Sequence, residues 1–247
     1  MKRDIWPRQC VITLCMAASI LLLPAAWSGE REDHGRPFYF SPHSTLFGRT
    51  YGEWSAKWWQ FVLSIPAVDN PLLQDDKSAA YQRGPVWFLT GKFCLNASCA
   101  SFLPVVRSVT IPAEKAVFFP VANSEWDNLG ISPPLTVAEE RAAAQASQDT
   151  VTTMSADLDG QAIDNLDPLT SPFRVLSPVF DYSIPDNNLY QALGYPFGAQ
   201  TIKDAVGDGV YVMLRPMSPG LHVLHFAAAF NFNFAFDVTY YITVKPE

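Results

Sequence analysis

The chain has 247 residues, a formal net charge of −7, 49% hydrophobic and 17% charged residues. Nucleic acid is therefore not an expected partner, because binding to phosphates requires clustered Lys and Arg. No run of basic residues would hold the chain to an anionic membrane. Twenty prolines and 13% aromatic residues favour many short strands joined by turns.

The amino terminus has the three zones of a secretory signal peptide. Basic residues come first (Lys2, Arg3 and Arg8), an apolar run follows from Cys10 to Leu23, and small residues stand at Ala26 and Ser28. A retained anchor is the alternative, but the run is shorter than the roughly 20 residues that span a bilayer. We expect cleavage after residue 28, which lowers the net charge from −7 to −9 by removing three basic residues and one acidic residue. The mature protein is then secreted or periplasmic, with no stable membrane insertion.

Only Cys94 and Cys99 remain after this cleavage, separated by four residues. In an oxidising compartment this spacing predicts a local disulfide. A redox pair or half of a metal site is the alternative, although redox pairs usually lie two residues apart and no further cysteine is present as a ligand. Asn96 begins an N-glycosylation acceptor sequence, which matters only in a host that uses it. We expect no metal and no cofactor.

The first element in chain order is an amphipathic helix over residues 51–65. Thr50 and Glu53 form a capping box, in which each side chain satisfies a backbone N–H at the helix start. Trp54 and Trp58 share the apolar face, which predicts that they fill the core. Trp59 lies off this stripe and is expected to be an exposed aromatic residue.

Strands dominate the rest of the chain. We expect strands at 85–93, 105–111, 116–121, 173–180, 210–215, 221–226 and 234–244, a polar loop at 123–128, and a surface helix at 137–154. Residues 112–115 and 217–220 are expected to be hairpin turns. The last strand alternates apolar and polar residues strictly, which indicates one face in a core.

These elements predict a mainly β fold, an antiparallel β-sandwich of jelly-roll or Ig-like type. It forms a single domain over residues 29–247, with an N-terminal amphipathic helix near 51–65 and an inserted surface helix near 137–154.

The sequence resembles a group of uncharacterised exported bacterial proteins. The likeness lies in the Tyr-Gly-Glu-Trp-Ser-x-x-Trp-Trp motif of residues 51–59, the segment 111–120 and the segment 208–214, and it covers most of the mature chain. It implies a bacterial, periplasmic or extracellular setting. It implies no activity and no site residues.

Acidic residues are the candidates for catalysis. Glu125 and Asp127 flank Trp126 in the expected loop, and glycoside hydrolysis needs two carboxyl groups about 5–10 Å apart. Calcium ligands and a solvated acidic loop are the alternatives. Glu53 is a third candidate acid. Nothing in the sequence supplies the desolvation that would separate the pKa values of an acid and a base.

Aromatic side chains are the candidates for binding, because ring faces can stack on sugars. Trp59 and Trp126 are the residues that we single out. His222 and His225 lie three apart in one strand, so alternation sends them to opposite faces and speaks against a shared metal. No nucleophile elbow, phosphate loop or His-Glu-x-x-His motif is present.

The sequence thus favours an exported, non-catalytic binding module for a carbohydrate, an envelope component or a protein partner. The alternative is a carboxylate-dependent polysaccharide hydrolase. The oligomeric state is not predicted.

Export and the disulfide can be tested together by mass spectrometry of protein recovered from the periplasm or the medium. The mature protein should begin near Gly29, and thiol labelling after denaturation without reductant should modify neither Cys94 nor Cys99. Full-length cytoplasmic protein, or two labelled thiols, would contradict these expectations.

Overall fold

The structure is a computed structural model that describes residues 37–93, 104–232 and 234–246. The predicted signal peptide, Cys94, Asn96 and Cys99 lie outside these residues. The helices are α1 (Tyr51–Leu63), α2 (Val137–Gln148) and α3 (Leu189–Ala192). The strands are β1 (Val86–Phe88), β2 (Val105–Pro112), β3 (Ala116–Trp126), β4 (Val151–Leu158), β5 (Gln161–Ala162), β6 (Arg174–Leu176), β7 (Phe180–Ile184), β8 (Gln200–Leu214), β9 (Gly220–Phe230) and β10 (Phe234–Lys245).

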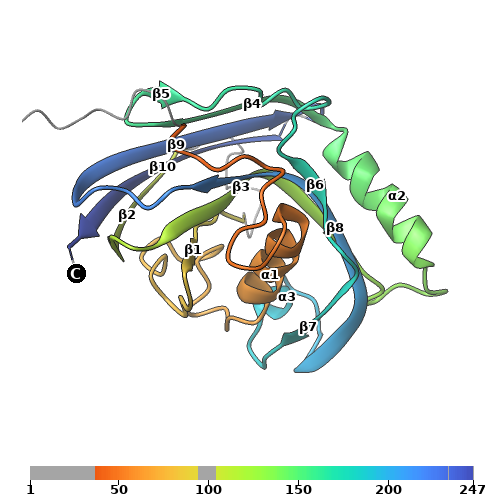
Figure 1. The fold of residues 1–247 in the computed structure, drawn as a ribbon. Coiled ribbons are helices and arrows are strands. Elements are labelled where there is room, and N and C mark those ends of the chain that lie inside the picture. The colour runs from red at the N-terminus through yellow and green to blue at the C-terminus, as the bar shows by residue number, and fades with distance from the viewer. Residues whose placement is uncertain (1–36, 94–103, 233, 247) are drawn as a thin grey trace, which may run out of the picture. The chain divides into compact units, whose positions relative to one another are not determined.

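The strands form two five-stranded sheets (Figure 1). The first sheet has the order β1-β3-β8-β6, with β7 also paired to β8, and the second has the order β2-β10-β9-β4-β5. The mainly β prediction is confirmed, while the jelly-roll or Ig-like type stays a prediction. The sheets are not purely antiparallel as expected, because β1 pairs with β3 and β2 pairs with β10 in parallel.

Both faces of the first sheet are covered along β3 and β8. Phe118 turns to the helical side, where its ring meets the Tyr51 ring of α1 at 5.8 Å. The next residue, Phe119, turns to the second sheet and meets Phe226 of β9 at 5.0 Å. Helix α1, the first sheet and the second sheet are therefore successive layers around the core (Figure 1). Among the described residues, no helix is long and apolar enough to cross a lipid bilayer.

Helix α1 forms as its sequence predicts. The Thr50–Glu53 capping box is present, and the helix ends at Leu63, two residues before the predicted end. Trp54 and Trp58 are buried in the core, which confirms their assignment. The indole N–H of Trp58 donates to the carbonyl oxygen of Leu89 at 2.8 Å, so this buried side chain has its polar atom satisfied.

Two predicted hairpins are wrong. Residues 112–115 connect β2 of the second sheet to β3 of the first, and residues 217–220 connect β8 of the first sheet to β9 of the second. Turn residues mark where a chain reverses, but they do not say which sheet the next strand joins. The burial patterns carry that information: β2 alternates between buried and exposed residues, whereas the first seven residues of β3 are all buried.

Several predicted bounds also differ. The expected loop at 123–128 is mostly strand, because β3 continues to Trp126 opposite β8. Helix α2 ends at Gln148 rather than at 154, since residues from Val151 onward pair with β9 as β4. The expected strand at 173–180 is divided into β6 and β7, and of the strand expected at 85–93 only Val86–Phe88 is paired. Long-range pairing overrides local propensity at each of these places.

Trp58→Ala should destabilise the protein by about 3–5 kcal/mol, the usual range for emptying a buried site of a large aromatic side chain. Denaturant unfolding of the purified mature protein measures this change. Tyr241→Ala is the matched control, because Tyr241 is 43% exposed, and it should change the unfolding free energy by only about 0.5 kcal/mol. Equal effects of the two substitutions would contradict the core assignment of α1.

Candidate functional site

The two candidate acids Glu125 and Asp127 lie at the end of β3. Glu125 is opposite Gly207 of β8, on the side of the sheet that carries α1. Its Oε1 atom is buried and has no hydrogen-bond partner among the described residues. The close approach of Trp59 to β8 makes this burial feasible. A Cβ on Gly207 would lie 3.2 Å from Nε1 of Trp59, so the glycine leaves room for the indole.

Burial raises the pKa of Glu125 well above its ordinary range. The charge of Asp127, a hydrogen bond between the two carboxyl groups and the charge of Glu140 raise this pKa further. The expectation that nothing desolvates these acids is therefore wrong. Sequence reasoning missed this because it placed Glu125 in a loop, whereas the residue lies in a strand that is covered by other elements. Glu125 retains its proton at pH values at which an ordinary glutamate is ionised.

Two tyrosines continue the polar cluster behind Asp127. The hydroxyl of Tyr182, on β7, donates to Oδ2 of Asp127. The hydroxyl of Tyr190, on α3, lies 2.8 Å from that of Tyr182 and is then the donor in this pair. Burial raises the pKa of both tyrosines, and the charge that Glu125 carries once it is ionised raises it further, so both hydroxyls stay protonated. A chain of hydrogen bonds thus leads from the carboxyl pair to α3.

A third carboxyl group comes from α2. Glu140 is fully buried, its Oε1 accepts a hydrogen bond of 2.6 Å from Nδ2 of Asn128, and its Oε2 has no partner among the described residues. Burial and the nearby charges of Asp127 and Asp204 raise the pKa of Glu140. The site therefore contains two glutamates, Glu125 and Glu140, in an environment that disfavours their ionisation.

Glycosidases keep both of their carboxyl groups free to act on a substrate, whereas Asp127 engages both of its carboxyl oxygens within the fold. Its Oδ1 accepts from the Leu129 backbone N–H and its Oδ2 from the Tyr182 hydroxyl. Retaining and inverting enzymes separate their two carboxyl groups by about 5–9.5 Å, because the sugar or an added water lies between them. Glu53, the third candidate acid, is not brought to the cluster. It is exposed, and its Oε2 accepts from the Thr50 backbone N–H and hydroxyl at the start of α1.

The two tryptophans proposed for binding are both packed. Trp59 is only 6% exposed and meets Trp58 edge to face at 4.9 Å, so the expectation that it is exposed is wrong. The residues packed on the α1 side of the sheet cover the flank of the helix that carries Trp59 as well as its apolar stripe. Trp126 is half-buried beneath α2, where its indole N–H donates to the hydroxyl of Ser147 at 3.0 Å.

A different aromatic pair is exposed, and the sequence analysis missed it. Tyr195 and Phe197 follow α3, with their rings nearly parallel at 7° and their centroids 6.1 Å apart. Tyr195 is 55% exposed, while Phe197 is half-buried. The sequence Gly-Tyr-Pro-Phe-Gly over residues 194–198, with aromatic residues between turn formers, is the signal that could have identified this pair.

The aromatic pair is held from several sides. Nδ2 of the buried Asn188 donates to the carbonyl oxygen of Phe197 at 2.8 Å, and the backbone N–H of Tyr195 donates to the carbonyl oxygen of Tyr190 at 2.9 Å. The Tyr190 ring meets the Phe197 ring edge to face at 6.1 Å. A Cβ on Gly130 would lie 2.7 Å from Cζ of Phe197, so only glycine permits this contact. The pair is fixed before any ligand arrives.

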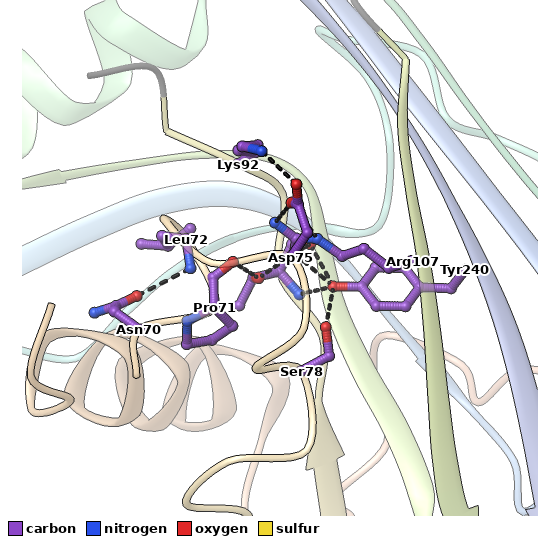
Figure 2. A network of polar contacts seen from close by, with 9 residues as sticks. Asn70, Pro71, Leu72, Asp75, Ser78, Lys92, Arg107 and Tyr240 are labelled. Atoms are coloured by element: carbon purple, nitrogen blue, oxygen red, sulfur yellow. Dashed lines mark hydrogen bonds and ion pairs between the residues drawn. The ribbon is translucent and has the colours of Figure 1, made fainter. Parts of the chain in front are cut away.

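A second polar network, centred on Arg107 of β2, joins the segment before β1 to the second sheet (Figure 2). The fully buried Arg107 guanidinium donates to Asp75 at 3.1 Å and to the Tyr240 hydroxyl at 2.8 Å. Burial acts to raise the pKa of Asp75, but hydrogen bonds and charges from Lys92 and Arg107 outweigh it and lower that pKa. Because these groups bond to each other, the network serves to hold the fold together.

The histidines lie on opposite faces of β9, as alternation predicts. His225 points outward, with its ring nitrogens 3.3 Å from Asp157 and 3.1 Å from Asp237. His222 contacts Asp159 at 2.7 Å. Within the described ranges, no three His, Cys, Asp or Glu side chains are arranged to hold a metal ion.

Surface hollows of about 550, 360 and 330 Å³ lie near Arg174, Ala227 and Pro172, and none of these three is lined by Glu125 or Asp127.

The unfolding free energy should reveal the protonated state of Glu125. The folded-state pKa is raised, so between the ordinary glutamate pKa and this raised value the native state binds more protons than the unfolded state. Stability should therefore fall in this window as the pH rises, with a slope of up to about 1.4 kcal/mol per pH unit. Glu125→Gln cannot lose this proton and should remove this contribution, which denaturant unfolding at a series of pH values measures.

Glu114→Gln is the control, because Glu114 is exposed and a hydrogen bond from Lys115 lowers its pKa. The unfolding free energy of Glu114→Gln should depend on pH as that of the wild type does, at pH values above the ordinary glutamate pKa. Parallel stability curves for the wild type and Glu125→Gln would show that the Glu125 carboxyl group titrates as it does in the unfolded chain.

Comparison with known proteins gives no further assignment of this site. No protein-family model matches the chain, and neither a curated protein nor a solved structure matches it.

Proposed function

We propose that the protein is an exported, non-catalytic binding module whose ligand is a carbohydrate. The observation that carries this proposal is the exposed and rigidly held pair of Tyr195 and Phe197. Among the ligand classes expected from the sequence, which also include an envelope component and a protein partner, a carbohydrate suits a pair of parallel rings best. The predicted signal peptide, and a sandwich scaffold of jelly-roll or Ig-like type, belong to this proposal.

Parallel aromatic rings are suited to sugars because one face of a pyranose ring presents C–H groups. Such a face packs on the π-face of a Tyr or Phe, while the sugar hydroxyls remain in contact with water and with polar side chains. The polar surroundings here are Asp186, whose Oδ1 accepts from the Ala199 backbone N–H, and Gln200, whose amide donates to the Gly198 carbonyl oxygen. Both side chains belong to exposed residues.

Rigidity strengthens this proposal. Binding to a mobile loop loses affinity because the loop must be ordered, whereas a preorganised site avoids this cost. Asn188 and Gly130 hold the Phe197 side of the pair.

Tyr195→Ala should weaken binding to the recognised polysaccharide about tenfold or more, since an aromatic contact contributes about 0.5–1.5 kcal/mol beyond the area that it buries. The measurement is a binding screen of the purified mature protein against cell-wall and plant polysaccharides. Tyr241→Ala, which removes an exposed tyrosine from the second sheet, should bind as the wild type does. Unchanged binding by Tyr195→Ala, or no binding by the wild type, would count against the proposal.

The second candidate function is a carboxylate-dependent polysaccharide hydrolase. One observation favours it: burial and the charge of Asp127 raise the pKa of Glu125, as catalysis by an acid and a base would require. The bonds from the Leu129 backbone N–H and the Tyr182 hydroxyl argue against it, because they engage both carboxyl oxygens of Asp127 within the fold.

The hydrolase alternative predicts that Glu125→Gln or Asp127→Asn lowers a hydrolytic rate by about a hundredfold or more, the scale for loss of a general acid or base. We expect instead that both variants remain folded and that neither loses activity relative to the wild type. Reducing-end assays on the same polysaccharides distinguish these outcomes. A hundredfold loss in either variant would replace the binding proposal with the enzymatic one.

A further inference from the structure

We infer that the turn between β9 and β10 is a contact site for the surface of a neutral lipid bilayer. The site is the phenylalanine tip, which we define as four side chains that lie together at this turn: Phe230, Phe232, Phe234 and Phe236. The tip lies at the end of the second sheet opposite the carboxyl end of β10 (Figure 1). The contact is peripheral and does not depend on the proposed carbohydrate site.

The apolar inner face of the second sheet extends beyond the elements that cover it. Tyr240 and Val238 of β10 are fully buried on this face. Phe236 and Phe234 follow on the same face and are only half-buried, and Phe232 in the turn is 61% exposed. A sheet face that reaches water usually changes to polar residues, whereas this one ends in aromatic rings. Apolar groups that are exposed together in this way mark a surface for a partner or a lipid.

The four rings form one connected cluster. The Phe230 ring centroid lies 5.2 Å from that of Phe234 and 6.1 Å from that of Phe236. Phe232 stacks on Phe234 at 5.9 Å, with the ring planes 12° apart. Phe230 and Phe236 also pack on a small core cluster that includes Val151 of β4. These two rings therefore anchor the tip, and Phe232 and Phe234 form its outer part.

The composition and the backbone of the turn suit an apolar environment. Residues 226–236 contain no Asp, Glu, Lys, Arg or His. The β9–β10 ladder continues to the pair Phe230 and Phe234, and the Asn231 backbone N–H donates to the Thr150 carbonyl oxygen at 2.8 Å. A lipid interface accepts a backbone whose polar groups are already paired, because unpaired groups lose their bonds to water there. Phenylalanine is also typical of segments that lie at the boundary between lipid headgroups and acyl chains.

The tip is too small to hold a second copy of the chain by itself. A large aromatic side chain covers about 150–250 Å², so four partly buried rings expose on the order of 300 Å². A stable protein–protein interface buries about 800 Å² on each partner. The net charge of −7 also opposes self-association and the approach to an anionic membrane. A neutral bilayer fits these limits, because it receives a few apolar side chains without requiring a large complementary surface.

Co-flotation of the purified mature protein with phosphatidylcholine vesicles measures its partition coefficient, and light scattering without vesicles measures its oligomeric state. Phe232→Ser should lower the partition coefficient about tenfold or more, the scale for withdrawing one large apolar side chain from a lipid environment. Phe232→Leu should retain most of the binding, because it keeps an apolar side chain at this position. Vesicles that also contain anionic phosphatidylglycerol should bind the wild type more weakly at low ionic strength, since the protein is negatively charged.

Tyr241→Ser is the matched control, because it removes an exposed aromatic side chain of β10 that lies away from the tip. It should partition as the wild type does. Equal partition of Phe232→Ser and the wild type, or no partition of the wild type, would overturn the inference. A wild type that is dimeric without vesicles, together with a monomeric Phe232→Ser, would also overturn it and would identify a second copy of the chain as the partner.

Discussion

Burial of β3 and β8 on both faces is the constraint on which the rest of the structure depends. From Ala116 to Ala122 and from Ala205 to Leu214 every residue is buried, so neither face of these stretches is open to water. One face is covered by the aromatic side of α1 and the other by the second sheet. Beyond the bulge between Pro120 and Ala122, α2 covers the face that the second sheet covered earlier, with Ser124 donating to the Ala144 carbonyl oxygen at 2.8 Å.

The carboxyl cluster is a consequence of this covering. Because β3 continues past its bulge between α2 on one side and β7 with α3 on the other, its polar residues are half-buried there. The Oε1 atom of Glu125 is shielded from water, which raises the pKa of this side chain, and Asp127 accepts from the Tyr182 hydroxyl. The raised pKa of Glu125 resembles that of a catalytic acid, but both carboxyl oxygens of Asp127 are hydrogen-bonded within the fold rather than available to a substrate.

Local patterns in the sequence predicted the features that depend on neighbours along the chain. The Thr50–Glu53 capping box and the apolar spacing of Trp54 and Trp58 are examples, and the structure confirms them. The wrong predictions concern contacts between distant segments. The sequence pattern predicts a solvated loop around Glu125, because its strand is defined only by pairing with β8. It predicts an exposed Trp59, because the residues that cover this flank of α1 lie outside the helix.

The raised pKa of Glu125 makes this side chain a protonated carboxylic acid in the folded protein at pH values at which an ordinary glutamate is ionised. The most direct measurement is the carboxyl carbon chemical shift of Glu125 as a function of pH, in protein labelled at glutamate and assigned with Glu125→Gln. We expect this resonance to keep the shift of a protonated acid well above the ordinary titration range of glutamate, about pH 4.3. A resonance that titrates in that ordinary range would contradict the burial of the Glu125 carboxyl group at the end of β3.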